Sequence, residues 1–346
     1  RLMKNIFKSL CFGLLLAFTV ISVNPVKDVN AATKTKVTYK LDKGTLTVSG
    51  KGEMPKKMTF KENKKIKKVV IKNGITSIPK YAFSDCKNLK KVVIGKDVKK
   101  IGKYAFSHTK VTSVNIPNKV KKIETGTFAY CKKLKKVNIG KKVNEIKGFT
   151  FWNCNNIKKI EIPNSVKVIE KQAFYKCKKL EKVKLGNNVQ TIGNSAFQTT
   201  NIKNVKIPNS VKDIKDYTFS GCNKLKDVKI PDGIKTIGEY AFGECTDLLS
   251  IIMPDSITDV EKSAFWKCES LSNVKLSAKL KSIKSSVFSE CIVLSNIEIP
   301  ESVTSIEDGA FNGCDKLNNI EIPRTVTSLS DEAFNVSEDL HIIYDG

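Results

Sequence analysis

The feature that most constrains this chain is a segment of 22 or 23 residues that recurs along nearly all of it. Residues 154–177 show the pattern: C-N-N-I-K-K-I-E-I-P-N-S-V-K-V-I-E-K-Q-A-F-Y-K-C. Each copy carries a Phe at one phase, and these anchors are Phe83, Phe106, Phe128, Phe151, Phe174, Phe197, Phe219, Phe242, Phe265, Phe288, Phe311 and Phe334. A fixed period in the twenties with an apolar skeleton predicts a solenoid of stacked repeats.

Each repeat contains a short strand pattern. In Ile160-Glu161-Ile162 the outer residues are apolar and the middle residue is polar, and Val114-Asn115-Ile116 and Val205-Lys206-Ile207 have the same pattern. Alternation with a period of two predicts a half-buried strand. Because the strand recurs at one phase, we expect thirteen strands, from residues 69–71 to residues 340–343, to form a parallel sheet with a spacing of about 4.8 Å.

The rest of each repeat must return the chain to the next strand. Turn residues such as Pro163-Asn164-Ser165 end the strand. Val166 and Ile169 then point inward, and Ala173-Phe174 follow on the opposite side. We expect short strands, 3₁₀ turns or helical turns there. The predicted fold class is therefore a repeat solenoid, mainly β or α/β, with a parallel sheet on one face.

The cysteines follow the repeat as well. Nine of the ten lie three residues after a Phe anchor: Cys86, Cys131, Cys154, Cys177, Cys222, Cys245, Cys268, Cys291 and Cys314. Their number is odd, and one per repeat gives a row of parallel side chains, whereas a disulfide needs convergent geometry. Small residues, Thr109, Thr200 and Ser337, replace Cys elsewhere in the row. We expect buried free thiols that act as small apolar side chains, with disulfides or metal binding as less favoured alternatives.

Residues 1–32 have the features of a secretory signal peptide. Lys4 and Lys8 form a basic region, residues 10–23 are apolar, and residues 29–31 fit a cleavage site with small residues. The sequence therefore predicts a secreted protein or an extracellular cell-surface protein. We expect no transmembrane segment in the mature chain.

The mature chain divides into two parts. Residues 33–60 are expected to form an N-terminal cap, in which residues 39–50 make two short strands around Asp42-Lys43-Gly44. A solenoid needs such an element because its first coil would otherwise expose an apolar end. Residues 61–346 are then the array of about 12 repeats of 22–23 residues.

The consensus C-x-x-L-x-x-V-x-I-P-x-x-V-x-x-I-x-x-x-A-F resembles the BspA-type (treponemal) leucine-rich repeat, and the resemblance covers about residues 39–346. Residues 44–54 are similar to a segment that often precedes such repeats. Departures are mild, with Thr127, Thr150, Thr218 and Val287 in place of Ala. The resemblance implies secreted or surface proteins of bacteria and some protists, some of them implicated in adhesion to host matrix proteins, epithelium or other microbes. It implies no enzymatic activity and no cofactor.

The net charge of +27 is unevenly distributed. Residues 33–190 hold 41 Lys and 10 acidic residues, a net charge of +31, whereas residues 191–346 hold 16 basic and 23 acidic residues, a net charge of −7. Lysines recur at the outward positions of the predicted strands. The candidate ligand-binding residues are Lys68, Lys91, Lys136, Lys159, Lys182, Lys184, Lys206 and Lys229. The alternative is a solvated face of a Lys-rich chain, because 59 of the 61 basic residues are Lys.

Little in the sequence points to catalysis. His108 and His341 lie some ten coils apart, so they cannot form a metal site or a catalytic triad together. Asp213 and Asp216 lie in a connecting loop, where surface charge is the expected explanation. We predict no catalytic residues, no metal and no cofactor. Nucleic acid is not expected as a partner, because the basic rows lack interleaved aromatic residues.

The expected function is that of a non-enzymatic exported binding scaffold, a surface adhesin or a protein- or glycan-interaction module that uses the strand face. Its partner would be a protein or an anionic glycan or wall polymer, attracted by the basic side chains. The alternative is a structural cell-envelope protein held on anionic wall polymer by its Lys-rich N-terminal half. Repeat scaffolds serve many functions, so this expectation depends on analogy with the family.

Overall fold

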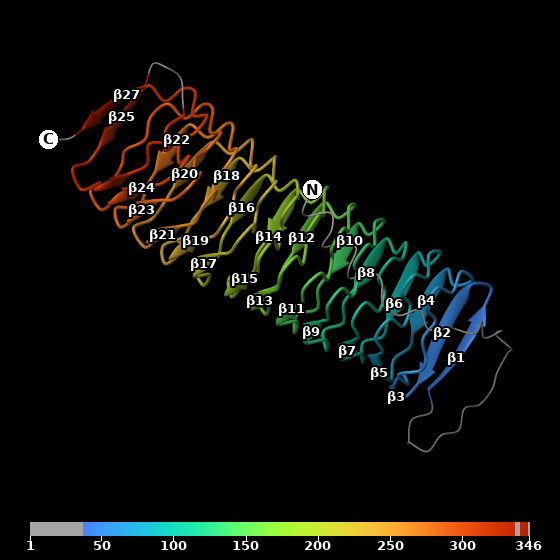
Figure 1. The fold of residues 1–346 in the computed structure, drawn as a ribbon. Helices are drawn as coiled ribbons and strands as arrows, with labels where there is room; N and C mark the ends of the chain where they lie inside the picture. Colours follow the sequence, from blue (N-terminus) through green and yellow to red (C-terminus); the bar gives the residue numbers. More distant parts are fainter. Residues whose placement is uncertain (1–36, 336–339, 345–346) are drawn as a thin grey trace. The chain divides into compact units, whose positions relative to one another are not determined.

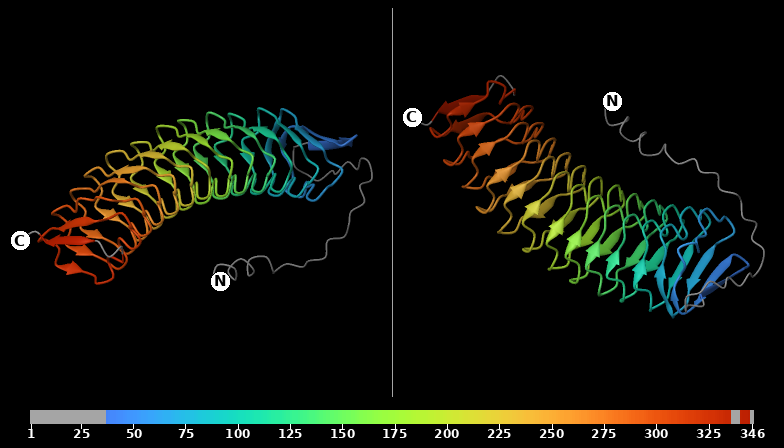
Figure 2. Two further views of the ribbon diagram at one scale, coloured as in Figure 1. Left: turned by 90° about the horizontal axis from the view of Figure 1, so that it is seen from above. Right: turned by 60° about the horizontal axis from the view of Figure 1, so that its bottom comes forward.

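A computed structural model describes residues 37–335 and 340–344. These residues belong to one compact unit, Thr35–Gly346, which is distinct from the unit Arg1–Lys34. The predicted signal peptide, residues 1–32, and Ser337 lie outside the described residues. Within the larger unit, successive coils stack in chain order (Figures 1 and 2).

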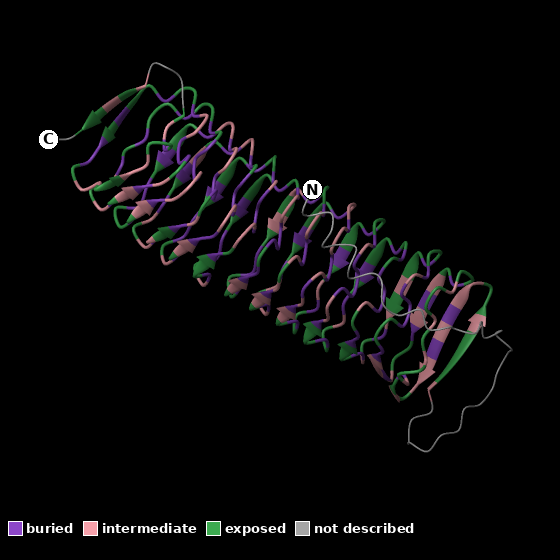
Figure 3. Ribbon diagram, in the orientation of Figure 1, coloured by how far each residue is buried: buried purple, intermediate pink, exposed green. Residues whose placement is uncertain are grey.

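The predicted parallel strands form one row along the array (Figure 1). They are β4 (Lys68–Ile71), β6 (Lys91–Ile94), β8 (Ser113–Asn115), β10 (Lys136–Asn138), β12 (Lys159–Glu161), β14 (Lys182–Lys184), β16 (Asn204–Lys206), β18 (Asp227–Lys229), β20 (Ser250–Ile252), β22 (Asn273–Lys275), β25 (Asn319–Ile322) and β27 (His341–Tyr344). Neighbouring strands pair in parallel, for example Ile160 with Val183. Buried and exposed residues alternate along the strands, as Figure 3 shows. The coil at residues 295–298 follows the same course without forming a strand.

A second row of shorter strands lies on the next side of each coil. It contains β3 (Gly52–Glu53), β5 (Ile75–Ile78), β7 (Lys100–Ile101), β9 (Lys122–Ile123), β11 (Glu145–Ile146), β13 (Val168–Ile169), β15 (Thr191–Ile192), β17 (Asp213–Ile214), β19 (Thr236–Ile237), β21 (Asp259–Val260), β23 (Ser282–Ile283), β24 (Ser305–Ile306) and β26 (Ser328–Leu329). Most have one outward residue and one buried residue, for example Lys122 and Ile123. The predicted solenoid is confirmed. The short strands precede Ala173-Phe174, which lie in turns, and the alternative of 3₁₀ or helical turns there is wrong, because residues 37–335 and 340–344 contain no helix.

The third side of each coil, here called the turn face, consists of the turns that carry the Phe anchors. Backbone N–H groups there donate to carbonyls of the next coil, Phe83 to Ala105 at 2.8 Å and Asp85 to Ser107 at 2.9 Å. The turn requires a positive φ at two phases of the repeat, as in Tyr81 (56°) and Asp85 (57°). Such angles are unfavourable for most residues, so hydrogen bonds between coils must hold this conformation in place.

The core is a continuous stack of rings. From Phe60 to Phe334, the neighbouring ring centroids lie 5.2 to 5.8 Å apart, and the ring planes are within 17° of parallel. Eleven of these rings, Phe83 to Phe311, are fully buried. Stacking of this kind stabilises by about 0.5–1.5 kcal/mol per pair beyond the burial of apolar area. The core therefore runs uninterrupted through all coils.

The nine cysteines Cys86 to Cys314 of the repeat row are buried free thiols beside this stack. Each Sγ donates to the carbonyl of a Phe in the preceding coil, as Cys154 does to Phe128 at 3.1 Å. Thr109 and Thr200 each donate instead to the Phe carbonyl of their own coil at 2.9 Å. Every one of these side chains is small and satisfies its own polar atom, which explains why Thr can replace Cys in the row.

The array begins with a hairpin. Strands β1 (Val37–Asp42) and β2 (Thr45–Gly50) are antiparallel, and β2 also pairs in parallel with β4. Residues 45–60 already follow the path of a coil, because β2 and β3 extend the two strand rows and Phe60 joins the ring stack. The Tyr39 ring meets Phe60 edge to face at 4.9 Å. Thus β1 and Tyr39 are the elements that cover the first coil.

Candidate functional site

The solvent-exposed side of the first strand row, here called the strand face, carries the lysines predicted to bind a ligand. Lys91, Lys136, Lys159 and Lys182 are exposed, and Lys68 is half-buried. The register places Lys68 opposite Lys91 and Lys159 opposite Lys182. Lys136 lies opposite Ser113. Lys68 and Lys91, and likewise Lys159 and Lys182, therefore lie on neighbouring strands whose backbones are about 4.8 Å apart, where their charges repel one another.

The second predicted row on the strand face is less uniform. Lys184 lies opposite Glu161, and its Nζ donates to Glu161 Oε1 at 2.7 Å. That hydrogen bond and the Lys184 charge lower the pKa of the Glu161 carboxyl. The two side chains are 78% and 70% exposed, so the pair adds little stability. Lys206 and Lys229 are exposed and lie directly opposite one another, so each has a lysine at the position where Lys184 has Glu161.

A third row of lysines widens the basic surface, and the sequence analysis did not identify it. These residues immediately precede the strands and are exposed: Lys67, Lys90, Lys135, Lys158, Lys203 and Lys226. Their backbones continue the stacking of coils, with the N–H of Lys90 donating to the carbonyl of Lys67 at 2.9 Å. The signal was present in the sequence as paired lysines at the start of four strands of the N-terminal half, at residues 67–68, 90–91, 135–136 and 158–159.

The outward side of the second strand row carries both signs of charge. Lys147 Nζ donates to Glu145 and to Glu170 Oε1, and Lys122 Nζ lies 2.7 Å from Glu145 Oε2. Partial burial favours a raised pKa for Glu145, but hydrogen bonds and charge from Lys122 and Lys147 outweigh it and lower the pKa. The same two carboxylates raise the pKa of Lys147. The charges of Lys122 and Lys147 are therefore partly neutralised, as that of Lys184 is on the strand face.

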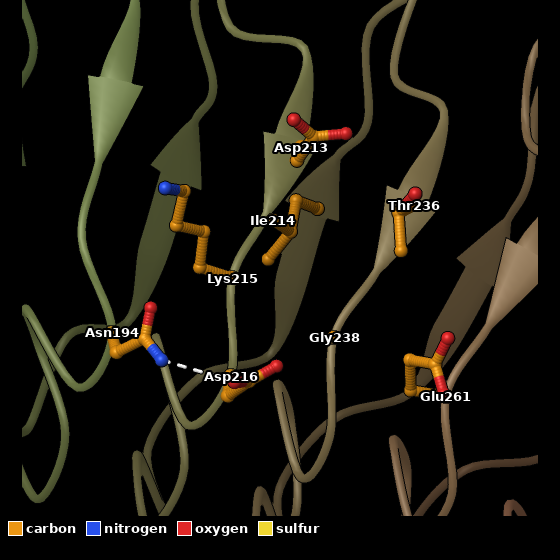
Figure 4. Close-up of a pocket in the computed structure, with 8 residues that line it drawn as sticks. All are labelled: Asn194, Asp213, Ile214, Lys215, Asp216, Thr236, Gly238 and Glu261. Atoms are coloured by element: carbon orange, nitrogen blue, oxygen red, sulfur yellow. Dashed lines mark hydrogen bonds between the residues drawn. The ribbon is translucent and has the colours of Figure 1, made fainter.

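Further along this side lies a polar hollow of about 510 Å³, lined in part by Asp213, Asp216 and Glu261 (Figure 4). Asp216 accepts a hydrogen bond from Asn194 Nδ2 at 3.0 Å and another from the backbone N–H of Glu239 at 3.1 Å. Both of its oxygens are thus engaged in joining neighbouring coils. In Figure 4 the carboxylates of Asp213 and Glu261 lie well apart, on different coils, so the hollow does not show a paired acid and base.

The turn face carries a group of aromatic side chains in the N-terminal half. The rings of Tyr81 and Tyr104 are stacked with centroids 5.5 Å apart, and those of His108 and Tyr130 are stacked at 4.5 Å. Trp152 continues the group at 4.8 Å from Tyr130. Sequence reasoning missed this group because its members come from different repeats. The available signal was that aromatic residues recur two positions before, and one or two after, successive Phe anchors.

These aromatic residues surround a hollow of about 200 Å³, here called the aromatic hollow. Tyr81, Tyr104, His108, Tyr130, Trp152 and Asp85 line it. Ser84 and Ser107 also line it, with hydroxyl oxygens 3.0 Å apart, and Ser84 donates to Asp85 Oδ2 at 2.8 Å. Burial and the neighbouring Tyr81 raise the pKa of Tyr104, so its hydroxyl stays protonated near neutral pH. The surface therefore combines ring faces with hydroxyl and carboxylate groups.

Family comparison agrees with this architecture. The model of the BspA type leucine-rich repeat region, with six copies, matches residues 54–164, 99–226, 144–271 and 212–341. The chain belongs to the BspA-type leucine-rich repeat family. No curated protein matches it.

Solved structures place this BspA-type chain among leucine-rich repeat proteins. A leucine-rich cell surface protein from Faecalibacterium prausnitzii A2-165 is 26% identical, with a TM-score of 0.51, over 92% of this chain and 96% of that one. A leucine-rich repeat protein from Bacteroides ovatus is 23% identical, with a TM-score of 0.62, over 92% and 100%. The pneumococcal vaccine antigen PcpA is 18% identical, with a TM-score of 0.51, over 93% and 99%. The last two show the fold alone.

The described part of this BspA-type array has few features of an enzyme. Among residues 37–335 and 340–344, no group of three or more His, Cys, Asp or Glu side chains is arranged to hold a metal ion. Burial raises the pKa of the Cys86 thiol to about 12 and that of Cys131 to about 11, so neither is a ready nucleophile. His108 is exposed on the turn face and His341 on the last strand. Over the same described ranges, no helix has the length and hydrophobicity needed to cross a membrane.

Proposed function

We propose that this chain is a non-enzymatic exported binding scaffold, a surface adhesin or a protein- or glycan-interaction module that acts through its strand face. The observation that carries the proposal is the row of lysines Lys68, Lys91, Lys136, Lys159 and Lys182 on one face of stacked strands. The cell-surface description of the Faecalibacterium prausnitzii relative supports an extracellular location.

The mechanism would be multivalent electrostatic contact. Neighbouring strands lie about 4.8 Å apart, which is shorter than the Debye length of about 8 Å at physiological salt. The lysine charges therefore act together on an approaching polyanion and raise its association rate. Each exposed charge contact contributes only about 0.2–1 kcal/mol, so useful affinity requires several at once. A polyanion of repeated charges, or an acidic patch on a protein, meets that requirement.

The test compares two five-lysine variants of the full chain. In the first, Lys68, Lys91, Lys136, Lys159 and Lys182 are changed to Ser. In the control, five exposed lysines at the second strand row are changed to Ser, namely Lys99, Lys100, Lys121, Lys167 and Lys235. Both variants lose the same charge. Binding to immobilised lipoteichoic acid and to matrix proteins is measured at low and high salt.

We expect the strand-face variant to bind the anionic polymer at least about tenfold more weakly, because several contacts of a few tenths of a kcal/mol are lost together. The control variant should lose much less, and high salt should weaken the wild type. Equal losses of affinity in the two variants would show that binding depends only on total charge. That result would overturn the proposal that the strand face is the binding site. Binding to one matrix protein that survives both salt and the variant would locate adhesion elsewhere on the array.

A second candidate is a structural cell-envelope protein held on anionic wall polymer. It is favoured by the concentration of positive charge, +31, in residues 33–190. Such a protein should be released from cells by high salt, because screening weakens contacts between exposed charges. Release by salt without specific binding to any host protein would favour this function over adhesion.

A further inference from the structure

We propose that the aromatic hollow on the turn face is a binding site for a neutral pyranose sugar, the terminal unit of a glycan. The site would be separate from the strand face and would not depend on its lysines. It is formed by four coils through Tyr81, Tyr104, His108, Tyr130 and Trp152, and Asp85 also lines it.

The fold does not require aromatic residues at these positions. The phase that holds Tyr81 and Tyr104 also has a positive φ in nine further coils. Six of these hold a non-aromatic residue there, Gly126, Gln172, Ser195, Ser263, Ser286 or Gly309, and three hold Phe149, Tyr217 or Tyr240. The phase of His108 and Tyr130 holds Asn153, Lys176, Thr199, Gly221, Glu244 and Lys267 elsewhere. The ring stack from Phe60 to Phe334 already fills the core. The aromatic residues of the hollow are therefore additional to what the repeat needs for folding.

The chemistry of the hollow suits a sugar ring. A pyranose has one face of C–H groups, which packs on the electron-rich face of an aromatic ring, and a rim of hydroxyl groups that need donors and acceptors. Tyr81 is 42% exposed and offers a ring to such a C–H face. The Asp85 carboxylate and the His108 ring are polar groups at the same hollow, whereas the Ser107 hydroxyl is buried and donates to the Tyr104 carbonyl. Its volume of about 200 Å³ suits one sugar unit, not a long peptide.

Charge argues for a neutral ligand. A small organic cation could also lie against aromatic rings beside Asp85. However, the hollow is also lined by Lys61 and lies in the half of the chain with a net charge of +31, which repels cations. Asp85 in turn disfavours an anionic group at the same place. A hydroxyl-rich neutral ring avoids both penalties and can accept from Lys61 while donating to Asp85.

A glycine positions one wall of the hollow. Gly126 occupies the phase of Tyr104 in the next coil, with a φ of 62°. A Cβ at Gly126 would lie 2.1 Å from Tyr104 Cε1, so any side chain there would displace the Tyr104 ring. Tyr104 is thus free to lie across the neighbouring coil, and Gly126 acts as a positioning residue for it.

The experiment titrates the full chain with methyl β-galactoside, methyl β-glucoside and N,N′-diacetylchitobiose at millimolar concentrations. Binding is followed by tryptophan fluorescence and by NMR of the sugar protons. The test variants are Tyr81→Ala and His108→Ala, both at exposed positions. The matched controls are Tyr217→Ala and Tyr240→Ala, because these rings stack at the same repeat phase, 5.2 Å apart, and do not line the aromatic hollow.

We expect saturable binding of at least one of the three sugars, weakened tenfold or more in both test variants and unchanged in both controls. The strand-face lysine variant should bind that sugar normally, and Tyr81→Ala should keep its affinity for lipoteichoic acid. The experiment therefore tests the sugar site independently of the strand-face site. No saturable response to any of the three sugars overturns the site. Equal effects in test and control variants also overturn it.

Discussion

The two halves of the array share one interior and differ in their surfaces. In the N-terminal half, residues 33–190, the net charge is +31, and in the C-terminal half, residues 191–346, it is −7. Yet the ring stack passes through both, with Phe151 and Phe174 5.2 Å apart and Phe242 and Phe265 5.4 Å apart. Both candidate binding surfaces, the lysine row and the aromatic hollow, lie mainly in the N-terminal half.

This contrast separates what the fold requires from what it leaves free. Inward positions must fit between two neighbouring coils, so each repeat keeps nearly the same side chains there. Outward positions contact solvent, and their side chains can change without disturbing the stack. A difference confined to outward positions is therefore more informative about function than any feature of the core.

The largest expected effect tests the shared interior. Phe174→Ala in the basic half and Phe265→Ala in the acidic half each remove a fully buried ring that stacks on two neighbours. We expect each to lower the free energy of unfolding by about 3–5 kcal/mol, because a large cavity remains. Urea denaturation followed by circular dichroism measures both.

Phe334→Ala serves as the reference, since Phe334 is only partly buried and its one stacking partner within the described residues is Phe311. It should cost clearly less than either central substitution. If Phe174→Ala and Phe265→Ala differed by several kcal/mol, the interior would not be equivalent in the two halves.

The next largest expected effect is a loss of folding stability at high pH, caused by the buried thiols. Burial raises the pKa of Cys154 and Cys245 well above the ordinary value of 9.0. Above about pH 9 the unfolded chain loses thiol protons that the folded chain retains, so stability is full below that pH and falls as pH rises toward the folded pKa values. Each thiol contributes a slope of about 1.4 kcal/mol per pH unit. Urea midpoints between pH 8 and 10 measure the total slope.

Removing one thiol in either half isolates this contribution. Cys154→Ala and Cys245→Ala should each reduce the slope above pH 9 by about 1.4 kcal/mol per pH unit, and by the same amount. The comparison of variant with wild type cancels the titration of lysines and tyrosines. A slope that neither substitution changes would mean that these thiols are not protected by the fold.

Much of the interior could be predicted from sequence because it repeats. The phase of Val114 and Ile116 predicted the strand, and the Phe period predicted that the anchors share one side of the coil. The second strand row was not distinguished from a turn, because a two-residue strand such as Val168–Ile169 is too short to show an alternation. The positive φ of Tyr81 was not predictable either, since tyrosine has no preference for that conformation.

The candidate binding surfaces could also be predicted only in part from the sequence. Lys184 and Glu161 are 23 residues apart, one repeat, so their ion pair follows from the period once the strand register is known. The aromatic hollow is harder, because Tyr81, Tyr130 and Trp152 occupy different phases of three repeats. Reading each repeat separately does not bring them together. Only the stacking of coils places those phases side by side.

The smallest expected effect comes from moving the lysine row to the C-terminal half, which reduces the difference in surface charge between the halves. Asn204, Asp227, Ser250 and Asn273 hold the outward positions of the C-terminal half that correspond to the lysine row. Changing all four to Lys moves the basic face onto β16, β18, β20 and β22. The control changes Thr236, Asp259, Ser282 and Ser305 to Lys, which adds the same charge on the second strand row. Both sets are introduced into the variant that lacks the five N-terminal lysines.

The grafted strand face should recover about fivefold in affinity for lipoteichoic acid, roughly 1 kcal/mol, because a few exposed charge contacts return while like charges on neighbouring strands repel. The control graft should recover less, since the second strand row presents its charges on another side of the coil. Recovery by the strand-face graft alone would mean that binding follows the charged row wherever the repeat carries it. If neither graft restored binding, residues specific to the N-terminal coils, such as Lys67 and Lys90, would have to form part of the site.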